Sequence, residues 1–267
     1  LLIGGEIIGD TSFVCIGEGF QRRYNNTDKK FENFRLPHYT TYFSTMCLFD
    51  DSKGNVWFGT YNGGIYKYSM TESRMYFIDL INSGMSSNAV TCFTEDKKGR
   101  VWAGTWGGGV AVIDDTIPTI IDSRNGLAAS KIYDILEDVE GNILISDQTN
   151  GLTIFKGDAF TTFSGDDILP NPNVNAIFES KSGEVWFGTG AGISRYKPGS
   201  GDKPIIYNWK SNAVPEEISF FKQDIDGNLW IGTTQGVIMF NMRTNRFEAQ
   251  SGINATLPSI MQVMSME

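Results

Sequence analysis

The sequence is poor in the side chains that most catalytic and metal sites require. Its 267 residues include one histidine, His38, and three cysteines, Cys15, Cys47 and Cys92. A single histidine excludes multi-histidine metal sites and weakens most general-base schemes. The cysteines are odd in number and lack metal or redox spacing, so we interpret them as small, buried, apolar side chains. The sequence therefore predicts no metal site, no cofactor and no catalytic residue.

Basic residues and long apolar runs are also scarce. Lys and Arg total 22 against 31 Asp and Glu, which gives a formal net charge of −9. Phosphate binding needs clustered cations, so we expect no nucleic-acid partner and no membrane contact by this chain. No apolar run reaches the roughly 18 residues of a membrane span. The start at Leu1 has no Met and no basic region, and we interpret the chain as a segment of a longer protein.

What the sequence has in abundance is glycine and a repeated string. The string reads (acidic or Ser)-x-x-Gly-x-x-Trp-x-Gly-Thr, where x is any residue. Four clear copies lie at 51–60, 96–105, 180–189 and 224–233. A weaker copy lies at 138–147, and a degenerate one lies at 10–17. In chain order the Trp position of the string falls at residues 15, 57, 102, 144, 186 and 230, and successive positions are 42–45 residues apart. Such a period with strand chemistry predicts propeller blades rather than helical repeats.

Each copy is typical of four antiparallel strands. An apolar inner strand, such as 90–93, meets a Gly turn, and the Trp strand follows, with Gly-Thr at its end. A loop then leads to a third strand and a more polar outer strand, as at 237–240 and 246–248. We predict an all-β propeller of four-stranded blades, with the repeated Trp residues mostly buried between blades. The repeat residues are Trp57, Trp102, Trp186, Trp230, Gly59, Gly104, Gly188 and Gly232.

These residues resemble the two-component regulator propeller repeat. The resemblance rests on acidic-x-x-Gly-Asn-x-Trp-x-Gly-Thr, and on segments 126–133 and 256–260, which resemble the family's Gly-Leu-Pro-x-x-x-Val element. It implies the periplasmic sensor of a bacterial hybrid histidine kinase, with a transmembrane helix, a kinase and any homodimer contacts supplied by the rest of the protein. Such sensors in glycan-degrading gut bacteria respond to saccharides, which implies a small-molecule or oligosaccharide ligand.

The number of blades is open at this point. Two copies depart from the repeat: Cys15 replaces Trp in the first, and Leu144 replaces it in the fourth, where Ser146 and Asp147 also replace Gly and Thr. Segment 259–264 resembles an inner strand that would complete the first blade and close a six-bladed ring. Alternatively, 2–8 is the first blade's own inner strand, and the chain is most of a seven-bladed ring, as the resemblance implies. We treat 1–267 as a single propeller domain.

The loops between second and third strands are the candidate ligand-binding surface. They carry aromatic rings and amides with few charges, which suits a neutral, hydroxyl-rich ligand held by stacking and hydrogen bonds. Asn and Gly are also ordinary turn formers, but a turn does not require the indole of Trp106. The candidate residues are Tyr61, Asn62, Trp106, Gln148, Asn150 and Gln235.

Three other interpretations deserve comparison. The stretch from Asp224 to Asn228 resembles the start of a calcium loop, but Gln235 and Gly236 stand where the distal Glu ligand is needed, and a hairpin turn explains it. A similarity to streptogramin (virginiamycin B) lyases implies a histidine base and a Mg²⁺ site, for which the chain offers only His38. A protein-interaction propeller would show an exposed apolar patch on one face.

Overall fold

The computed structural model describes residues 2–8, 11–16, 20–25, 30–34, 45–114, 117–128, 130–163, 168–208 and 217–249, with side chains considered from residue 45 onward. His38 and segment 259–264 lie outside the described residues. Within these ranges the chain is almost entirely β-strand, with one short helix, α1 (Leu80–Ser83), and one 3₁₀ turn, η1 (Ser123–Asn125). None of the helices in this part of the chain is long and apolar enough to cross a membrane.

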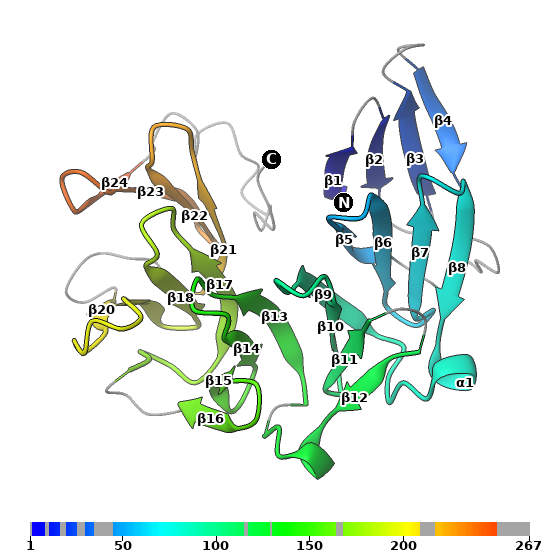
Figure 1. Cartoon of the computed structure of the whole chain (residues 1–267). Helices are drawn as coiled ribbons and strands as arrows, with labels where there is room; N and C mark the ends of the chain where they lie inside the picture. The colour runs from blue at the N-terminus through cyan, green and yellow to red at the C-terminus, as the bar shows by residue number, and fades with distance from the viewer. Residues whose placement is uncertain are drawn as a thin grey trace. The chain divides into compact units, whose positions relative to one another are not determined.

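The strands form six four-stranded sheets, each built from strands consecutive in the chain (Figure 1). The first three are β1 (Leu2–Ile8), β2 (Thr11–Ile16), β3 (Phe20–Asn25) and β4 (Lys30–Phe34); β5 (Thr45–Asp50), β6 (Asn55–Thr60), β7 (Ile65–Ser69) and β8 (Arg74–Ile78); and β9 (Val90–Glu95), β10 (Val101–Thr105), β11 (Val110–Ile113) and β12 (Thr119–Ile121). The last three are β13 (Ile132–Glu137), β14 (Ile143–Asp147), β15 (Gly151–Phe155) and β16 (Phe160–Phe163); β17 (Val174–Glu179), β18 (Val185–Thr189), β19 (Gly192–Tyr196) and β20 (Ile205–Tyr207); and β21 (Ile218–Gln223), β22 (Leu229–Thr233), β23 (Gly236–Asn241) and β24 (Arg246–Ala249).

The six sheets confirm the all-β prediction and the six repeats. Every Trp position, including Cys15 and Leu144, falls on the second strand of its sheet. Strand β1 pairs with β2 in antiparallel register, so the interpretation of 2–8 as the first blade's own inner strand is confirmed. The predicted Gly turn is also present, since Gly99 has φ +74°, a left-handed conformation that suits glycine.

The chain divides into two compact units, Leu1–Ile135 and Leu136–Met266, called unit 1 and unit 2 below. Each is described by itself. The predictions of a single domain and of a closed ring concern how the two units meet, and they stay predictions.

The repeated indoles are core residues that join one sheet to the next. Trp57, Trp102 and Trp186 are 2%, 1% and 0% exposed. Trp57 packs in a cluster with Val90 and Ala103 of the following sheet. Leu144 occupies the same position in its own sheet and packs with residues of β17 and β18. The apolar contact between neighbouring sheets is therefore kept where Leu144 replaces the indole.

Trp230 is partly exposed, unlike the other three repeated indoles. Its sheet, β21–β24, is the last that the structure describes in unit 2, so no later described sheet of that unit packs on it. The position in the repeat is as predicted, but its burial depends on a neighbour.

The acidic residue that opens each repeat holds the indole. Asp51 Oδ2 accepts a 2.8 Å hydrogen bond from Trp57 Nε1, while Oδ1 accepts from the backbone N–H of Lys53 and Asn55. The same indole bond recurs from Trp102 to Asp96 at 2.8 Å and from Trp230 to Asp224 at 2.9 Å. Burial tends to raise the pKa of Asp96 and Asp224, but these hydrogen bonds outweigh it and lower both pKa values. Asp224 thus belongs to a hairpin clamp, as the hairpin interpretation predicted.

The glycine two residues after each Trp is required because inner-strand side chains, from its own sheet or from the following one, pack closely against it. At Gly59 an added Cβ would lie 2.4 Å from Cys47 Sγ and 2.8 Å from a methyl group of Val90. At Gly104 it would lie 2.5 Å from Cys92 Sγ, and Gly188 and Gly232 are similarly enclosed. Both cysteines are free thiols; Cys92 is buried as predicted, with its pKa raised by burial, and Cys47 is half-buried.

Candidate functional site

The threonine that ends each Trp strand shapes the loop where the candidate residues lie. Thr60 Oγ1 donates to the carbonyl of Gly64 and accepts from the N–H of Gly63, each at 2.8 Å. Thr105 makes the same two bonds around its loop, and the Thr189 and Thr233 hydroxyls also donate to a loop glycine carbonyl. In the fourth repeat the Asp147 carboxylate takes over and accepts from the N–H of Asn150. Each loop is therefore fixed at its base before any ligand arrives.

Tyr61 and Trp106 directly follow these threonines and face one hollow in unit 1. Their rings lie edge to face, with centroids 6.3 Å apart and planes at 75°. Both side chains remain open to solvent, 44% and 41% exposed. The hollow measures about 660 Å³, and Asn62 with segment 86–89 completes its lining. Three of the candidate residues are thus brought together: Tyr61, Asn62 and Trp106.

The backbone of Trp106 is held from two neighbouring connections. Its N–H donates to the Ala89 carbonyl at 2.8 Å, and its carbonyl accepts from Ser87 Oγ at 3.1 Å. The next N–H, of Gly107, donates to the Ser130 carbonyl at 2.8 Å. The exposed indole therefore stands on a rigid base, which limits the entropy lost when a ligand stacks on it.

Several polar groups of the hollow have no partner within the described part of the protein. Trp106 Nε1, the Tyr61 hydroxyl, the Asn62 amide and the Ser86 hydroxyl make no hydrogen bond to any described residue. None of the residues lining the hollow is charged. Donors, acceptors and aromatic faces without charge are the chemistry that suits a neutral polyhydroxyl compound.

The remaining candidates belong to unit 2. Gln148 and Asn150 lie in the loop between β14 and β15, and both are half-buried. Gln235 is exposed in the loop between β22 and β23, with its N–H bonded to Thr233 Oγ1. These loops are equivalent to those of Tyr61 and Trp106 within their own sheets. Participation of the three amides in one site stays a prediction.

Sequence reasoning missed the wall formed by Ser86, Ser87 and Asn88. These residues lie in the connection between α1 and β9, outside the loops between second and third strands on which the prediction was based. A signal was present, since three polar residues interrupt the apolar pattern directly before an inner strand.

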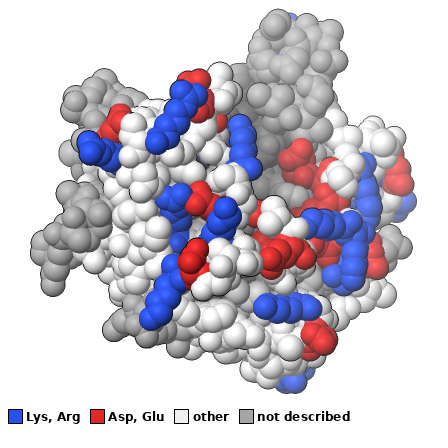
Figure 2. Space-filling view, turned by 60° about the vertical axis from the view of Figure 1, so that its left-hand side comes forward, with Lys and Arg blue, Asp and Glu red and all other residues white. Residues whose placement is uncertain are grey.

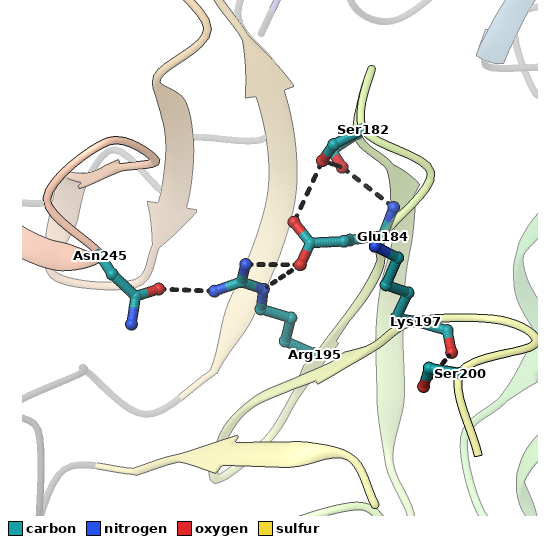
Figure 3. Close-up of polar contacts among 7 residues, drawn as sticks. Ser182, Glu184, Arg195, Lys197, Ser200 and Asn245 are labelled. Carbon is teal, nitrogen blue, oxygen red and sulfur yellow. Dashed lines mark hydrogen bonds and ion pairs between the residues drawn. The ribbon is translucent and has the colours of Figure 1, made fainter. Parts of the chain in front are cut away.

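A second polar arrangement, in unit 2, sits over a repeat indole. The Arg195 guanidinium lies 5.1 Å from the Trp186 ring centroid and pairs with Glu184 at 2.5 Å. Figure 3 shows that Asn245, from the turn between β23 and β24, accepts from the other side of Arg195. Ser182 Oγ donates to Glu184 at 3.1 Å (Figure 3). The two charges neutralise each other, and Asn245 links Arg195 to the next sheet, so this cluster braces two sheets rather than offering a site.

Charged side chains of one sign do not form a continuous patch on the face drawn in Figure 2. Figure 2 shows Lys and Arg interspersed with Asp and Glu over the face displayed. That face has no continuous row of cations to follow a phosphate backbone.

Three segments of the chain, 39–62, 84–107 and 168–191, match the family model described as "Two component regulator propeller". The chain carries propeller repeats of this family. All residues that line the Tyr61–Trp106 hollow fall within the first two matched repeats. No curated protein matches the chain.

Solved structures show the same fold at low sequence identity. The extracellular domain of the hybrid two component system BT3049 from B. thetaiotaomicron has a TM-score of 0.73 at 24% identity, covering 88% of this chain and 32% of that one. The corresponding domain of BT4673 from the same organism has a TM-score of 0.75 at 18% identity, covering 94% and 36%. Virginiamycin B lyase from Staphylococcus aureus has a TM-score of 0.73 at 17% identity, covering 92% and 83%. The chain of propeller repeats thus spans about a third of the length of the two sensor domains.

Proposed function

We propose that this chain is a ligand-sensing propeller segment from the extracytoplasmic part of a two-component signalling protein. The observation that carries the proposal is the uncharged, aromatic hollow at Tyr61 and Trp106, which lies within two matched propeller repeats. The likeness to two extracellular sensor domains supports the same assignment. In this proposal the segment binds rather than catalyses, and kinase activity belongs to other parts of the full-length protein.

The proposed ligand is a neutral saccharide. The C–H face of a pyranose would stack on the Trp106 indole, with the Tyr61 ring standing edge-on beside it. Sugar hydroxyls would then meet the Asn62 amide and the Ser86 hydroxyl, which have no partners among the described residues. A neutral ligand suits this lining because no charge is present to offset the desolvation of an ionic group.

The position of the hollow suggests how binding would be transmitted. Tyr61 follows β6 and Trp106 follows β10, so a bound sugar would touch two successive sheets of unit 1. If the ligand binds more tightly to one arrangement of these two sheets, it shifts the conformational equilibrium towards that arrangement. In this proposal the shift is the signal passed to the rest of the protein.

Calorimetric titration with a panel of neutral oligosaccharides tests the proposal. We expect saturable binding that falls at least about tenfold in Trp106→Ala, equivalent to about 1.4 kcal/mol. Ile117→Ala is the matched control, because Ile117 is an exposed apolar residue of the same unit outside the hollow. Equal binding by wild type and Trp106→Ala would place the site elsewhere, and Gln148→Ala with Gln235→Ala would then test the loops of unit 2.

A lyase is the competing function, because the fold likeness covers 83% of virginiamycin B lyase. At 17% identity this likeness concerns the fold alone. Turnover of a streptogramin that is abolished by His38→Ala would replace the sensor proposal with the lyase.

A further inference from the structure

A second hollow, of about 320 Å³, lies at the other end of β6 from the first. Lys53, Lys67, Ser69, Glu72, Tyr76 and Phe77 contribute to its lining. Asn55, which also lines it, begins β6, whereas Tyr61 of the first hollow follows the last residue of that strand. A six-residue strand spans about 17 Å. The two hollows are therefore separate places on the β5–β8 sheet.

Lys67 is the unusual residue of this second hollow. Its Nζ lies 5.3 Å from the Trp57 ring centroid and 5.8 Å from that of Tyr76. The ammonium makes no hydrogen bond and no ion pair with any residue that the structure describes. The nearby carboxylate of Asp51 is occupied by Trp57 Nε1 and the Asn55 amide.

The other cations over repeat indoles are neutralised. Arg100 lies 5.4 Å from the Trp102 ring centroid and pairs with Asp96 at 2.7 Å. Arg195 stacks on Trp186 and pairs with Glu184. Lys67 has the same place over an indole without the carboxylate, so its charge and its three donors are available to a ligand.

The rest of the lining fits a ring that carries an acid. The Tyr76 ring provides an aromatic surface beside Lys67, and the Arg74 guanidinium, 5.1 Å from the ring centroid, adds a second cation next to it. The Ser69 and Thr71 hydroxyls lie 3.1 Å apart, and Lys53, held by its bond to the Gly99 carbonyl, adds positive charge at the rim. Glu72 is the one acidic group of the lining, and it accepts a hydrogen bond from the Tyr76 hydroxyl.

We propose that this hollow binds a small carboxylate borne on a ring. The carboxylate pairs with Lys67 Nζ, and the ring lies against Tyr76. The site is independent of the Tyr61–Trp106 hollow, because it uses charge where the other has none. Glu72 opposes the ligand's charge, so it limits affinity.

Calorimetric titration at low salt tests this with two probes, D-glucuronate and benzoate, which distinguish a sugar acid from a flat aromatic acid. D-glucose is the neutral counterpart of the first probe. We expect at least one acid to bind with a dissociation constant of about 10 mM or lower. In Trp106→Ala, where the saccharide hollow is disabled, glucose should bind at least about tenfold more weakly than the acid. Raising NaCl should weaken binding of the acid, because an accessible ion pair is screened by salt.

The decisive variant is Lys67→Met, which should lose at least about tenfold in affinity for the acid. Met is compatible with this register position, because Met239 stands opposite Trp230 as Lys67 stands opposite Trp57. Lys98→Met, an exposed turn lysine outside the hollow, is the matched control. Glu72→Gln should bind more tightly than wild type. Trp106→Ala should leave acid binding unchanged, which separates this site from the saccharide proposal.

The proposal is wrong if neither acid binds, if glucose binds to Trp106→Ala as well as glucuronate does, or if Lys67→Met binds the acid like wild type while its thermal unfolding is unchanged.

Discussion

The β9–β12 and β17–β20 sheets solve the same packing problem with different polar chemistry. In the first, Trp102 Nε1 donates to Asp96. In the second, Ser180 stands in place of the aspartate, and Trp186 Nε1 has no hydrogen-bond partner among the described residues although the side chain is fully buried. An orphaned buried donor of this kind costs about 1–3 kcal/mol, so the second sheet must be stabilised in another way.

The β17–β20 sheet compensates through aromatic packing. Trp186 stacks on Tyr207 with planes at 8° and meets Phe240 edge-on at 4.9 Å. Arg195 covers the indole from the polar side. Both sheets therefore bury a large indole, and this burial is the shared requirement of the repeat. The hydrogen bond from the indole to a carboxylate is one way to stabilise the buried side chain, and aromatic packing is the other.

The largest expected effect tests the shared part of this comparison. Trp102→Ala and Trp186→Ala should each lower the free energy of unfolding by about 3–5 kcal/mol, because each leaves a large cavity in place of a fully buried side chain. Chemical denaturation of both variants measures this. A loss in one variant smaller by more than about 2 kcal/mol would mean that the two sheets do not share the same packing role.

The next effect tests the clamp. Asp96→Asn should lower the free energy of unfolding by about 2–3 kcal/mol. The N–H groups of the new amide would face the Trp102 or Arg100 donors, where the aspartate oxygen accepts a hydrogen bond. Ser180→Ala should cost less than about 1 kcal/mol, since the Ser180 hydroxyl bonds to Ser182 and the Glu184 N–H rather than to the indole. Equal losses in urea denaturation would contradict the difference drawn between the sheets.

A matched pair isolates the indole N–H itself. Trp102→Phe and Trp186→Phe remove similar volume, but only the first breaks a hydrogen bond. We expect Trp102→Phe to be about 1–2 kcal/mol more destabilising than Trp186→Phe. Thermal unfolding of the two variants side by side gives the difference, and the reverse order would show that Trp186 Nε1 is satisfied in solution.

The smallest expected effect is a change in how stability depends on acid pH. The folded-state pKa of Asp96 is lowered, so its stabilisation is complete above the unfolded value of about 3.9 and is lost as the pH falls through the folded pKa. Asp96→Asn should therefore flatten the decline of stability below about pH 4. Ser180→Ala, which removes no carboxylate, should keep the wild-type pH profile. A profile of Asp96→Asn that matches wild type would mean that other groups govern acid unfolding.

Much of the fold could be predicted because its signals are local. The Gly turns, the alternation of strands and the period of 42–45 residues depend on residues close together in the chain. The same pattern placed Leu144 correctly at an indole position, and it placed Tyr61 and Trp106 in equivalent loops. It could not reveal that Trp230 is more exposed than the other repeated indoles, because a residue's covering neighbour is not specified by its own repeat.

The candidate site was only partly predictable for the same reason. Tyr61, Asn62 and Trp106 could be named from one repeat at a time, but Ser86 and Ser87 meet them only when two sheets pack together. Lys67 drew no attention as a single lysine in a strand. Among the described residues no carboxylate pairs with it, and this becomes notable only by comparison with Arg100 and Arg195, which also lie over indoles and do pair with a carboxylate.

By itself, the sequence determined six repeats of four strands, the positions of their buried indoles and the loops that carry exposed aromatic rings, because hairpin chemistry and apolar alternation act over a few residues. Only the tertiary structure decided which groups are satisfied and which are free. Residues about one repeat apart meet across neighbouring sheets, as when the Ser52 N–H donates to Glu95 at 2.7 Å or the Lys181 N–H donates to Gln223 at 2.9 Å. Such contacts depend on the packing of whole sheets, and so do the two hollows of unit 1.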